Sequence, residues 1–258
     1  MSLLGVNHLT LVAGDKMLVS DLSVQFEAGQ SWAVLGPNGS GKTTLLNCLA
    51  GLHPAQAGEV QVMERDINRL AHRDRAQEIG IVFQHYDDAF PSTVFDHVLA
   101  GRHPHIASSL FAVETEKDRQ LARDAMRQME LEHLAQRSIT TLSGGERRRV
   151  DIAVLLAQDT PVRILDEPCN HLDLRHQGSV LHHLTRTNSE GKLNIFALHD
   201  VNQAFSYCDH ALLLFEDGSV QAGPINTVAT RATLEQLYQC KLIEISNNNN
   251  TLLLPDFD

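Results

Sequence analysis

A glycine-rich segment near the start of the chain could hold phosphate. It reads Gly36-Pro37-Asn38-Gly39-Ser40-Gly41-Lys42-Thr43 and directly follows the apolar run Ser31 to Leu35. Its glycines allow backbone N–H groups to point at phosphate oxygens, Lys42 supplies positive charge to the β and γ phosphates, and the Thr43 hydroxyl can ligate Mg²⁺. Thr44 completes the predicted set. The segment therefore predicts binding of a nucleotide with Mg²⁺.

A second glycine motif lies before another helical run and reads Leu142-Ser143-Gly144-Gly145-Glu146. It supplies a further row of free backbone N–H groups at a helix start, where phosphate can bind. This motif has no lysine. The chain thus carries two phosphate-facing motifs of unequal charge, and that asymmetry needs an explanation.

Two adjacent carboxylates follow a short apolar run, Val162 to Leu165. This run has the character of a buried strand, so Asp166 falls at its end, beside the first glycine loop, where it can hold Mg²⁺ directly or through water. Glu167 points elsewhere and is the natural group to orient or deprotonate an attacking water.

The elements around these motifs follow from hydrophobic patterning. Helical spacing dominates from Thr93 to roughly Asp159 and predicts an inserted helical region. Elsewhere short apolar or β-branched runs predict strands at Leu3 to Val12, Leu18 to Phe26, Ile79 to Phe83, Leu193 to Leu198 and Ala211 to Phe215. Strands separated by helices indicate βαβ units in a parallel sheet.

Composition narrows the function further. The chain has 258 residues, 43% of them hydrophobic, and a net charge of -11, so a folded core is expected and nucleic acid is a poor partner. The one basic cluster, Arg147-Arg148-Arg149, is expected to form a solvated or ion-paired helix face. No apolar run approaches the roughly 20 residues needed to cross a bilayer, and no signal peptide is evident. The four cysteines form no CxxC pair and are expected to be free thiols.

In combination these motifs resemble the ATP-binding cassette family, the nucleotide-binding subunits of ABC transporters. The resemblance spans roughly residues 3 to 225 and includes the family's order of motifs. That order is Walker A at 36–43, the Q-loop glutamine Gln84, the signature at 142–146, Walker B at 162–166 followed by Glu167, the D-loop at 170–173 and the switch histidine His199.

The resemblance implies a fold and a domain arrangement. The expected fold class is α/β, a P-loop NTPase core with a mostly parallel sheet, an N-terminal antiparallel β subdomain and an inserted helical subdomain. One ATPase domain is expected over residues 1–245, with the helical subdomain at about 93–160. Residues 246–258 are expected to form a short, flexible tail.

The resemblance also explains the asymmetry of the two glycine motifs. In this family two cassettes pack head to tail, so Ser143, Gly144 and Gly145 would touch the γ-phosphate of ATP held by the partner. Gln84 and His199 would sense the γ-phosphate, Mg²⁺ and the attacking water. The implied catalytic set is Glu167, His199, Gln84 and Lys42, and the implied Mg²⁺ ligands are Thr43, Gln84 and Asp166.

Two positions depart from the family pattern. Many members stack an aromatic residue on adenine, but the corresponding slot near Val12 or Ala13 has no Tyr, Phe or Trp nearby. Adenine is therefore expected to make aliphatic contacts. Cys169 stands where Thr or Ser is usual, and its similar size predicts little effect on hydrolysis.

A narrower resemblance concerns importers of ferric siderophores, haem and cobalamin. It depends on Thr93 to Val98, Gly101 to His105, and Leu172-Asp173-Leu174 with His176-Gln177. It implies a homodimer of cassettes, two integral-membrane permease subunits, indirectly a substrate-binding protein, and a place at the cytoplasmic face of the inner membrane. The alternatives are a cassette of a zinc or manganese importer or of an exporter, or a soluble ABC protein acting on ribosomes or DNA.

Overall fold

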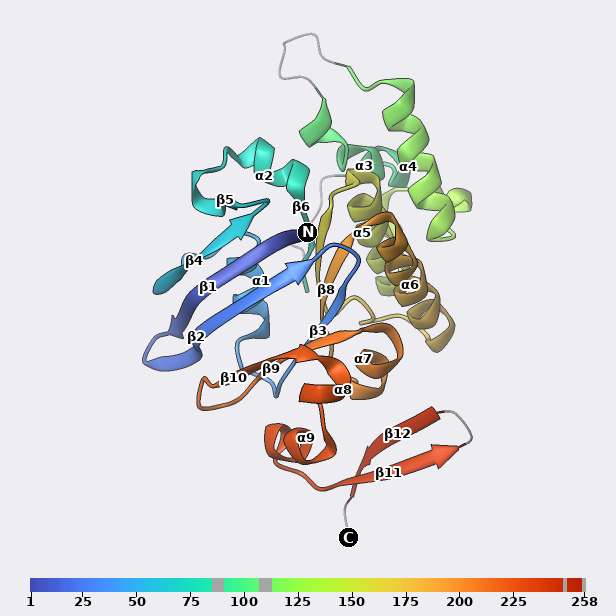
Figure 1. The fold of residues 1–258 in the computed structure, drawn as a ribbon. Helices are drawn as coiled ribbons and strands as arrows, with labels where there is room; N and C mark the ends of the chain where they lie inside the picture. Colours follow the sequence, from blue (N-terminus) through green and yellow to red (C-terminus); the bar gives the residue numbers. More distant parts are fainter. Residues whose placement is uncertain (85–90, 107–112, 248–249, 257–258) are drawn as a thin grey trace.

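A six-stranded sheet forms the centre of the molecule (Figure 1). The structure is a computed structural model and describes residues 1–84, 91–106, 113–247 and 250–256. The strand order is β10-β9-β3-β8-β7-β6, and every neighbouring pair is parallel except β9 with β10. The strands are β3 (Ser31–Leu35), β6 (Ile79–Val82), β7 (Val162–Asp166), β8 (Leu193–Ala197), β9 (His210–Leu214) and β10 (Val220–Pro224). The prediction of a mostly parallel sheet is confirmed.

A second, antiparallel sheet is built largely from the N-terminal region and has the order β2-β1-β4-β5. Its strands are β1 (Ser2–Ala13), β2 (Lys16–Glu27), β4 (Ala57–Val62) and β5 (Arg65–Asp66). The helix α1 (Lys42–Leu49) contributes Leu45, Leu46 and Leu49 to the hydrophobic cluster that this sheet shares with the central sheet. The predicted antiparallel subdomain is therefore present and packs on the glycine-loop helix.

The helical region lies at one end of the central sheet (Figure 1). It comprises α3 (Val94–Ala100), η2 (His103–His105), α4 (Glu116–Gln128), η3 (Glu132–Leu134), η4 (Ile139–Thr141) and α5 (Gly144–Gln158). Thr115 and Asp118 form a capping box that starts α4, and Asp118 also pairs with the buried Arg102 at 2.9 Å. On α4, Ala125 is buried and Leu121 is half-buried. The helical subdomain is thus an insertion between β6 and β7, and its buried side chains belong to the same hydrophobic cluster as one face of the central sheet.

The remaining helices connect or cover the strands. They are η1 (Ile67–Arg69), α2 (His72–Glu78), α6 (Leu174–Arg186), η5 (Thr187–Glu190), α7 (Val201–Tyr207), α8 (Ile225–Val228) and α9 (Arg231–Tyr238). None of the helices in the described ranges is long and apolar enough to cross a bilayer.

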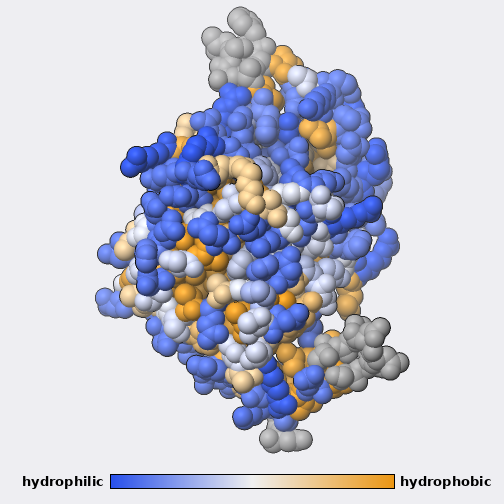
Figure 2. Space-filling view, in the orientation of Figure 1, coloured by the Kyte–Doolittle hydropathy of each residue, from blue (hydrophilic) through white to orange (hydrophobic). Residues whose placement is uncertain are grey.

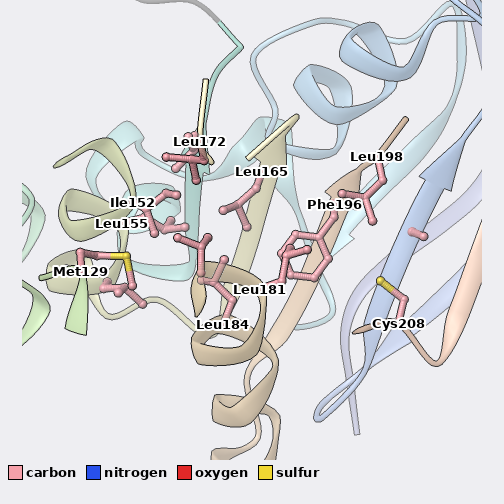
Figure 3. Close-up of a cluster of buried hydrophobic side chains, with 14 of the residues drawn as sticks. Met129, Ile152, Leu155, Leu165, Leu172, Leu181, Leu184, Phe196, Leu198 and Cys208 are labelled. Carbon is pink, nitrogen blue, oxygen red and sulfur yellow. The ribbon is translucent and has the colours of Figure 1, made fainter. Parts of the chain in front are cut away.

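Both faces of the central sheet are buried, which explains the continuous apolar runs of its strands. Leu165 and Phe196 face one cluster, where they lie with side chains of α5 and α6 such as Ile152 and Leu181 (Figure 3). The alternate residues along the same strands, such as Ile164, face the opposite cluster beneath the antiparallel sheet. These two hydrophobic clusters hold the strands in place, and the predicted site residues lie at the ends of those strands.

The C-terminal segment forms a hairpin that the sequence did not predict. Strand β11 (Leu242–Asn247) pairs antiparallel with β12 (Asn250–Pro255) and so crosses residue 245, the expected domain boundary. Asn202 of α7 exchanges two hydrogen bonds with the Leu253 backbone, at 2.9 and 3.1 Å. Ile243, Ile245, Leu252 and Leu254 are exposed on the hairpin, at the lower right of Figure 2. Residues 248–249 and 257–258 of the expected tail lie outside the described residues, and its flexibility stays a prediction.

Candidate functional site

The first glycine motif connects a buried strand to a helix, as predicted. Strand β3 ends at Leu35, the loop follows, and α1 begins at Lys42. Gly41 caps the helix with a φ of 100°, and a Cβ there would lie 2.9 Å from the Leu18 Cβ. Both the positive φ and the close contact require glycine at this position. Within the loop Gly36 and Ser40 are buried, Pro37, Gly41 and Thr44 are half-buried, and Asn38, Gly39 and Thr43 are exposed.

Lys42 lies under this loop. Its ammonium group donates to the carbonyl oxygens of Gly36 at 2.7 Å and Pro37 at 3.1 Å. Burial lowers the pKa of Lys42, while the nearby charges of Glu167 and Asp166 raise it and so offset part of that effect. The lysine and both carboxylates predicted from the sequence therefore act on one another electrostatically.

Three buried oxygens at this site have no hydrogen-bond partner among the described residues. They are the Ser40 hydroxyl and both carboxylate oxygens of Asp166, the last residue of β7. Burial raises the pKa of Asp166, and the neighbouring Thr43 hydroxyl lowers it. A buried carboxylate without a partner is costly, whereas carboxylate and hydroxyl oxygens are ligands that Mg²⁺ accepts. The residues present therefore fit a magnesium ion at Asp166 and Thr43.

Glu167 is the centre of a cluster of polar side chains. The Gln84 amide donates to Glu167 Oε2 at 2.8 Å, Asn170 Nδ2 donates to the same oxygen, and His199 Nε2 pairs with Oε1. The structure thus brings together Glu167, Gln84 and His199, which lie far apart in the sequence. Their roles in hydrolysis stay predictions.

The backbone and the charge of Glu167 are both unusual. Its φ of 49° lies in the left-handed region, which a non-glycine residue keeps only where its surroundings hold it. Burial raises the pKa of its carboxyl, but the hydrogen bonds from His199, Asn170 and Gln84 outweigh this and leave the pKa below its ordinary value. The carboxylate is therefore charged at neutral pH and fixed in orientation.

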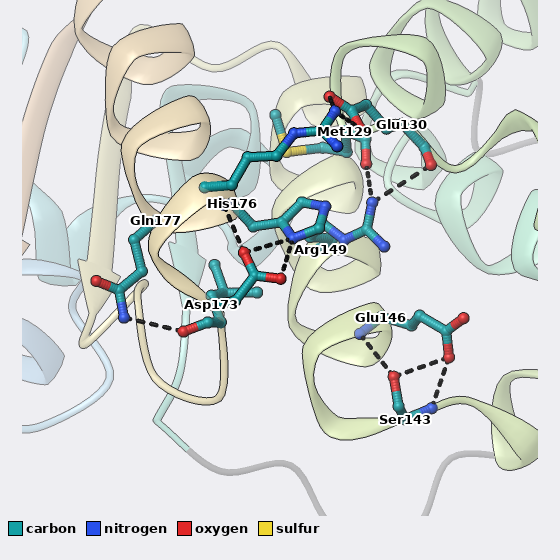
Figure 4. A network of polar contacts seen from close by, with 10 residues as sticks. Met129, Glu130, Ser143, Glu146, Arg149, Asp173, His176 and Gln177 are labelled. Carbon is teal, nitrogen blue, oxygen red and sulfur yellow. Dashed lines mark hydrogen bonds and ion pairs between the residues drawn. The ribbon is translucent and has the colours of Figure 1, made fainter.

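The second glycine motif begins α5 (Figure 4). Ser143 caps the helix, since its hydroxyl accepts from the Glu146 N–H at 3.3 Å while Glu146 accepts from the Ser143 N–H and hydroxyl at 2.8 Å. A Cβ at Gly145 would lie 2.9 Å from the His171 carbonyl oxygen, so the D-loop backbone occupies the space of a side chain. This packing favours glycine at that position.

Ser143, Gly144 and Gly145 line a hollow of about 510 Å³ together with residues 171–173 and His176. No residue of the glycine loop at 36–43 lines it. Within one chain the structure therefore brings Lys42, Asp166, Glu167, Gln84 and His199 into one site and leaves the Ser143 motif in another.

Asn170 and Arg148 both contact Glu167, although neither had a predicted role at the site. Asn170 contacts Glu167, although the sequence identified it only as part of the D-loop.

The expectation of a solvated or ion-paired face for Arg147-Arg148-Arg149 is wrong for two of the three. Arg148 and Arg149 are 5% and 8% exposed and donate to backbone carbonyls, and Arg147 alone follows the expectation, 3.4 Å from Asp151. The helical pattern of the sequence does not indicate that these arginines donate to backbone carbonyls of other segments.

The structure describes both positions that depart from the family pattern, the adenine slot and Cys169. Val12 and Ala13 form the end of β1, and burial raises the pKa of the Cys169 thiol to about 12. Cys169 is therefore a neutral, partly buried thiol at neutral pH.

Comparison with known proteins gives a consistent result. Residues 19–170 match the family model described as ABC transporter. The chain is 35% identical to the ferric enterobactin transport ATP-binding protein FepC of Escherichia coli (strain K12), over 96% of this chain and 92% of that protein. It is 36% identical to the hemin import ATP-binding protein HmuV of Thermobifida fusca (strain YX), over 98% and 88%.

Solved structures agree with this assignment. A metal-chelate type ABC transporter in an inward-facing conformation matches with a TM-score of 0.85 and 31% identity, covering 100% of this chain and 98% of that one. The ATP-binding cassette MJ0796, in a dimeric post-hydrolysis state bound to ADP and Pi, matches with a TM-score of 0.75 and 27% identity over 86% and 98%. Fold, motif order and relatives together show that the chain belongs to the ATP-binding cassette family and is an ABC transporter ATPase.

Proposed function

We propose that this chain hydrolyses ATP to power uptake of a metal chelate of the ferric siderophore, haem or cobalamin type. The observation that carries the ATPase site is the convergence of Gln84, Asn170 and His199 on Glu167 beside the lysine of the glycine loop. The substrate class rests on relatives named for ferric enterobactin and hemin, and on a structural neighbour named for a metal chelate.

The protein would form no covalent bond to the phosphate, since phosphoryl transfer depends on positioning and on neutralising charge. Lys42 and the backbone N–H groups of residues 36–43 would hold the β and γ phosphates. Glu167 would orient the attacking water and accept its proton. His199 and Gln84 hold that carboxylate now and would contact the γ-phosphate side of the site.

Magnesium would be held by the Thr43 hydroxyl, the Asp166 carboxylate and the Gln84 amide oxygen. The buried Asp166 oxygens, which lie near the Thr43 hydroxyl, support this assignment. When bound, the ion neutralises charge on the phosphates and polarises them.

A complete site needs two chains in this proposal. The Ser143 motif offers N–H groups and a hydroxyl at a helix N-terminus, where negative charge is favoured. It lies in a hollow apart from its own glycine loop, which supports contact with ATP held by a partner cassette. The active form would therefore be a head-to-tail homodimer.

The transport partners follow from the same assignment. Two integral-membrane permease subunits would carry the solute, and the helical subdomain of each cassette would dock a short cytoplasmic helix of the permease. ATP-driven closure of the two cassettes would pull on that helix, and hydrolysis would reset it. A substrate-binding protein would act indirectly, and the cassettes would lie at the cytoplasmic face of the inner membrane.

Transport measurements in the native host test this proposal. Deleting the gene should abolish uptake of one of three radiolabelled solutes, namely a ferric siderophore, haem or cobalamin. The intact chain should restore uptake, and Glu167→Gln, produced to the same level, should not.

Affinity purification of the intact chain from detergent-solubilised membranes should recover an integral-membrane permease. Unchanged uptake of all three solutes in the deletion strain would refute the substrate class. Recovery of ribosomes without a permease would refute a transport role.

A further inference from the structure

Arg148 lies between the helix of the Ser143 motif and the end of β7. It is 5% exposed, and its guanidinium faces the chain segment that carries Glu167. It donates to the carbonyl oxygens of Asp166, of Glu167 at 2.9 Å and of Pro168 at 3.4 Å. One buried side chain thus binds three consecutive carbonyls.

These bonds hold the backbone turn that aims Glu167. The turn has the left-handed φ of 49°, and the Glu167 N–H donates to the Ala197 carbonyl of β8 at 3.2 Å. Arg148 binds the carbonyl on the other side of the same residue. Such a conformation persists only where the surroundings determine it from more than one side. Removing Arg148 therefore frees one side of the turn.

The same guanidinium also holds the residue before Gln84. Arg148 Nη1 donates to the Phe83 carbonyl at 2.5 Å, and the Gln84 amide donates to Glu167 Oε2 at 2.8 Å. Both partners of this side-chain hydrogen bond are thus attached to backbone that Arg148 fixes. The relative position of Gln84 and Glu167 depends on Arg148.

Arg148 belongs to the helix that Ser143 caps. The two residues are five positions apart on α5, which corresponds to about 7.5 Å along a helix axis. Over so short a length an α-helix moves as one body. A shift of the Ser143 end is therefore carried to the guanidinium and to the carbonyls that it binds.

We infer that Arg148 is a positioning residue that holds Glu167 and Gln84 in register with the helix of the Ser143 motif. The inference rests on the proposed function. In the dimer, contact of Ser143 with the partner's ATP would be linked through Arg148 to the carboxylate that acts on the chain's own ATP. Arg148 would thereby connect the two composite sites.

Arginine suits this position because its planar fork offers five donors in fixed directions. A lysine would keep the charge, but its three donors sit on one nitrogen and lack the planar fork that spans the Phe83 carbonyl and the carbonyls of 166–168. A glutamine would remove the buried charge and keep two donors. The two substitutions therefore separate the loss of geometry from the loss of charge.

The test measures steady-state ATP hydrolysis by purified Arg148→Lys and Arg148→Gln. Misplaced groups at a reacting centre can cost roughly 10²-fold in rate, so we expect kcat to fall by at least about tenfold in both variants. KM for ATP should change by less than about threefold, because the glycine loop is untouched. ATP-bound dimers should accumulate on gel filtration, since binding and closure precede the impaired step.

Arg102→Lys is the matched control. Arg102 is 6% exposed and donates to the carbonyls of Ala157 and Gln158, at the other end of α5. Its substitution should leave kcat within about twofold of the intact chain, because no side chain of the cluster around Glu167 contacts it.

The inference is overturned if either Arg148 variant keeps full kcat, if Arg102→Lys loses as much, or if the variants fail to dimerise with ATP. These results would leave the proposed function intact as long as Glu167→Gln is inactive. Normal hydrolysis by Glu167→Gln would instead refute the proposed site.

Discussion

At the scale of single residues, the surroundings of Glu167 fix the position of its carboxylate but do not make it more basic. Three side chains donate to it, and their hydrogen bonds outweigh burial and keep its pKa below the ordinary value. A general base works best with a pKa near the operating pH. If Glu167 acts on the attacking water as proposed, this arrangement favours orienting that water over taking its proton.

The first prediction concerns the charge of that group. Glu167→Gln keeps the size and several hydrogen bonds but removes the negative charge, so ATP hydrolysis should fall by roughly 10²-fold or more. ATP binding should persist, and ATP-bound dimers should accumulate on gel filtration. Turnover at the rate of the intact chain would show that Glu167 does not act on water.

The second prediction concerns Asn170, which the sequence placed in a loop without linking it to Glu167. Asn170→Ala removes a hydrogen bond to a charged carboxylate, so kcat should fall by roughly three- to tenfold with little change in KM. The control is Asn68→Ala, which alters an exposed amide remote from the site. Equal kcat in both variants would exclude a positioning role for Asn170.

Glu167 could be placed from the sequence because it follows a recognisable strand, whereas Gln84 and His199 were expected at the site only from the resemblance to the ATP-binding cassette family. Their hydrogen bonds to one another could not be predicted. Those contacts depend on the left-handed turn at Glu167, which returns the chain so that Asn170 N–H meets the Glu167 carbonyl at 3.2 Å. A single non-glycine residue at positive φ leaves no clear signal in the sequence.

At the scale of elements, α5 shows where periodicity is not enough. Its arginine run was expected to face water or acidic side chains, but Arg148 binds the end of β7 and Arg149 binds the Met129 and Glu130 carbonyls (Figure 4). The helix lies at the junction of the core and the helical subdomain, so it is covered on several sides. Long polar side chains there satisfy backbone carbonyls of other segments.

The third prediction concerns α4. Asp118 accepts from Thr115 and pairs with the buried Arg102, and these contacts lower its pKa to about 2. A depressed folded-state pKa stabilises the protein above the unfolded-state pKa. This contribution, roughly 1 to 2 kcal/mol, should be lost as the pH falls from about 4 to about 2.

Urea unfolding at stepped pH measures this effect as a difference between the intact chain and Asp118→Asn. The intact chain should be the more stable of the two at neutral pH, and the gap should close between about pH 4 and pH 2 as Asp118 takes up its proton. A gap that does not change over this range would show that the Asp118 carboxylate does not stabilise α4.

The C-terminal hairpin illustrates a second limit of prediction. The sequence predicts a flexible tail over residues 246–258, but it carries no signal for the pairing of β11 with β12. Their attachment depends on Asn202, a residue of α7 far away in sequence. Local composition does not reveal such a contact.

At the scale of the whole molecule, the mostly parallel sheet could be predicted because most of its strands are apolar on both faces and helices are interposed between them, whereas the antiparallel subdomain was expected only from the family resemblance. The alternation that sends Leu165 to one core and Ile164 to the other is a direct consequence of strand geometry. The separation of the two glycine motifs is a property of the complete fold. Lys42 and Ser143 lie at different helix starts, and the hollow that Ser143 lines includes no residue of the glycine loop.

The central claim is that each active site is shared between two chains, and mixing two inactive variants tests it most directly. Lys42→Ala disables the glycine loop, and Ser143→Ala disables the motif that would contact the partner's ATP. Each variant alone should hydrolyse ATP at least about tenfold more slowly than the intact chain, because each site lacks one phosphate contact.

Mixed in equal amounts, the two variants form mixed dimers in which one site has an intact Lys42 from one chain and an intact Ser143 from the other. About half of all dimers are mixed and one of their two sites is intact, so the mixture should recover about a quarter of the normal rate. A rate no higher than the average of the two separate variants would contradict a shared site.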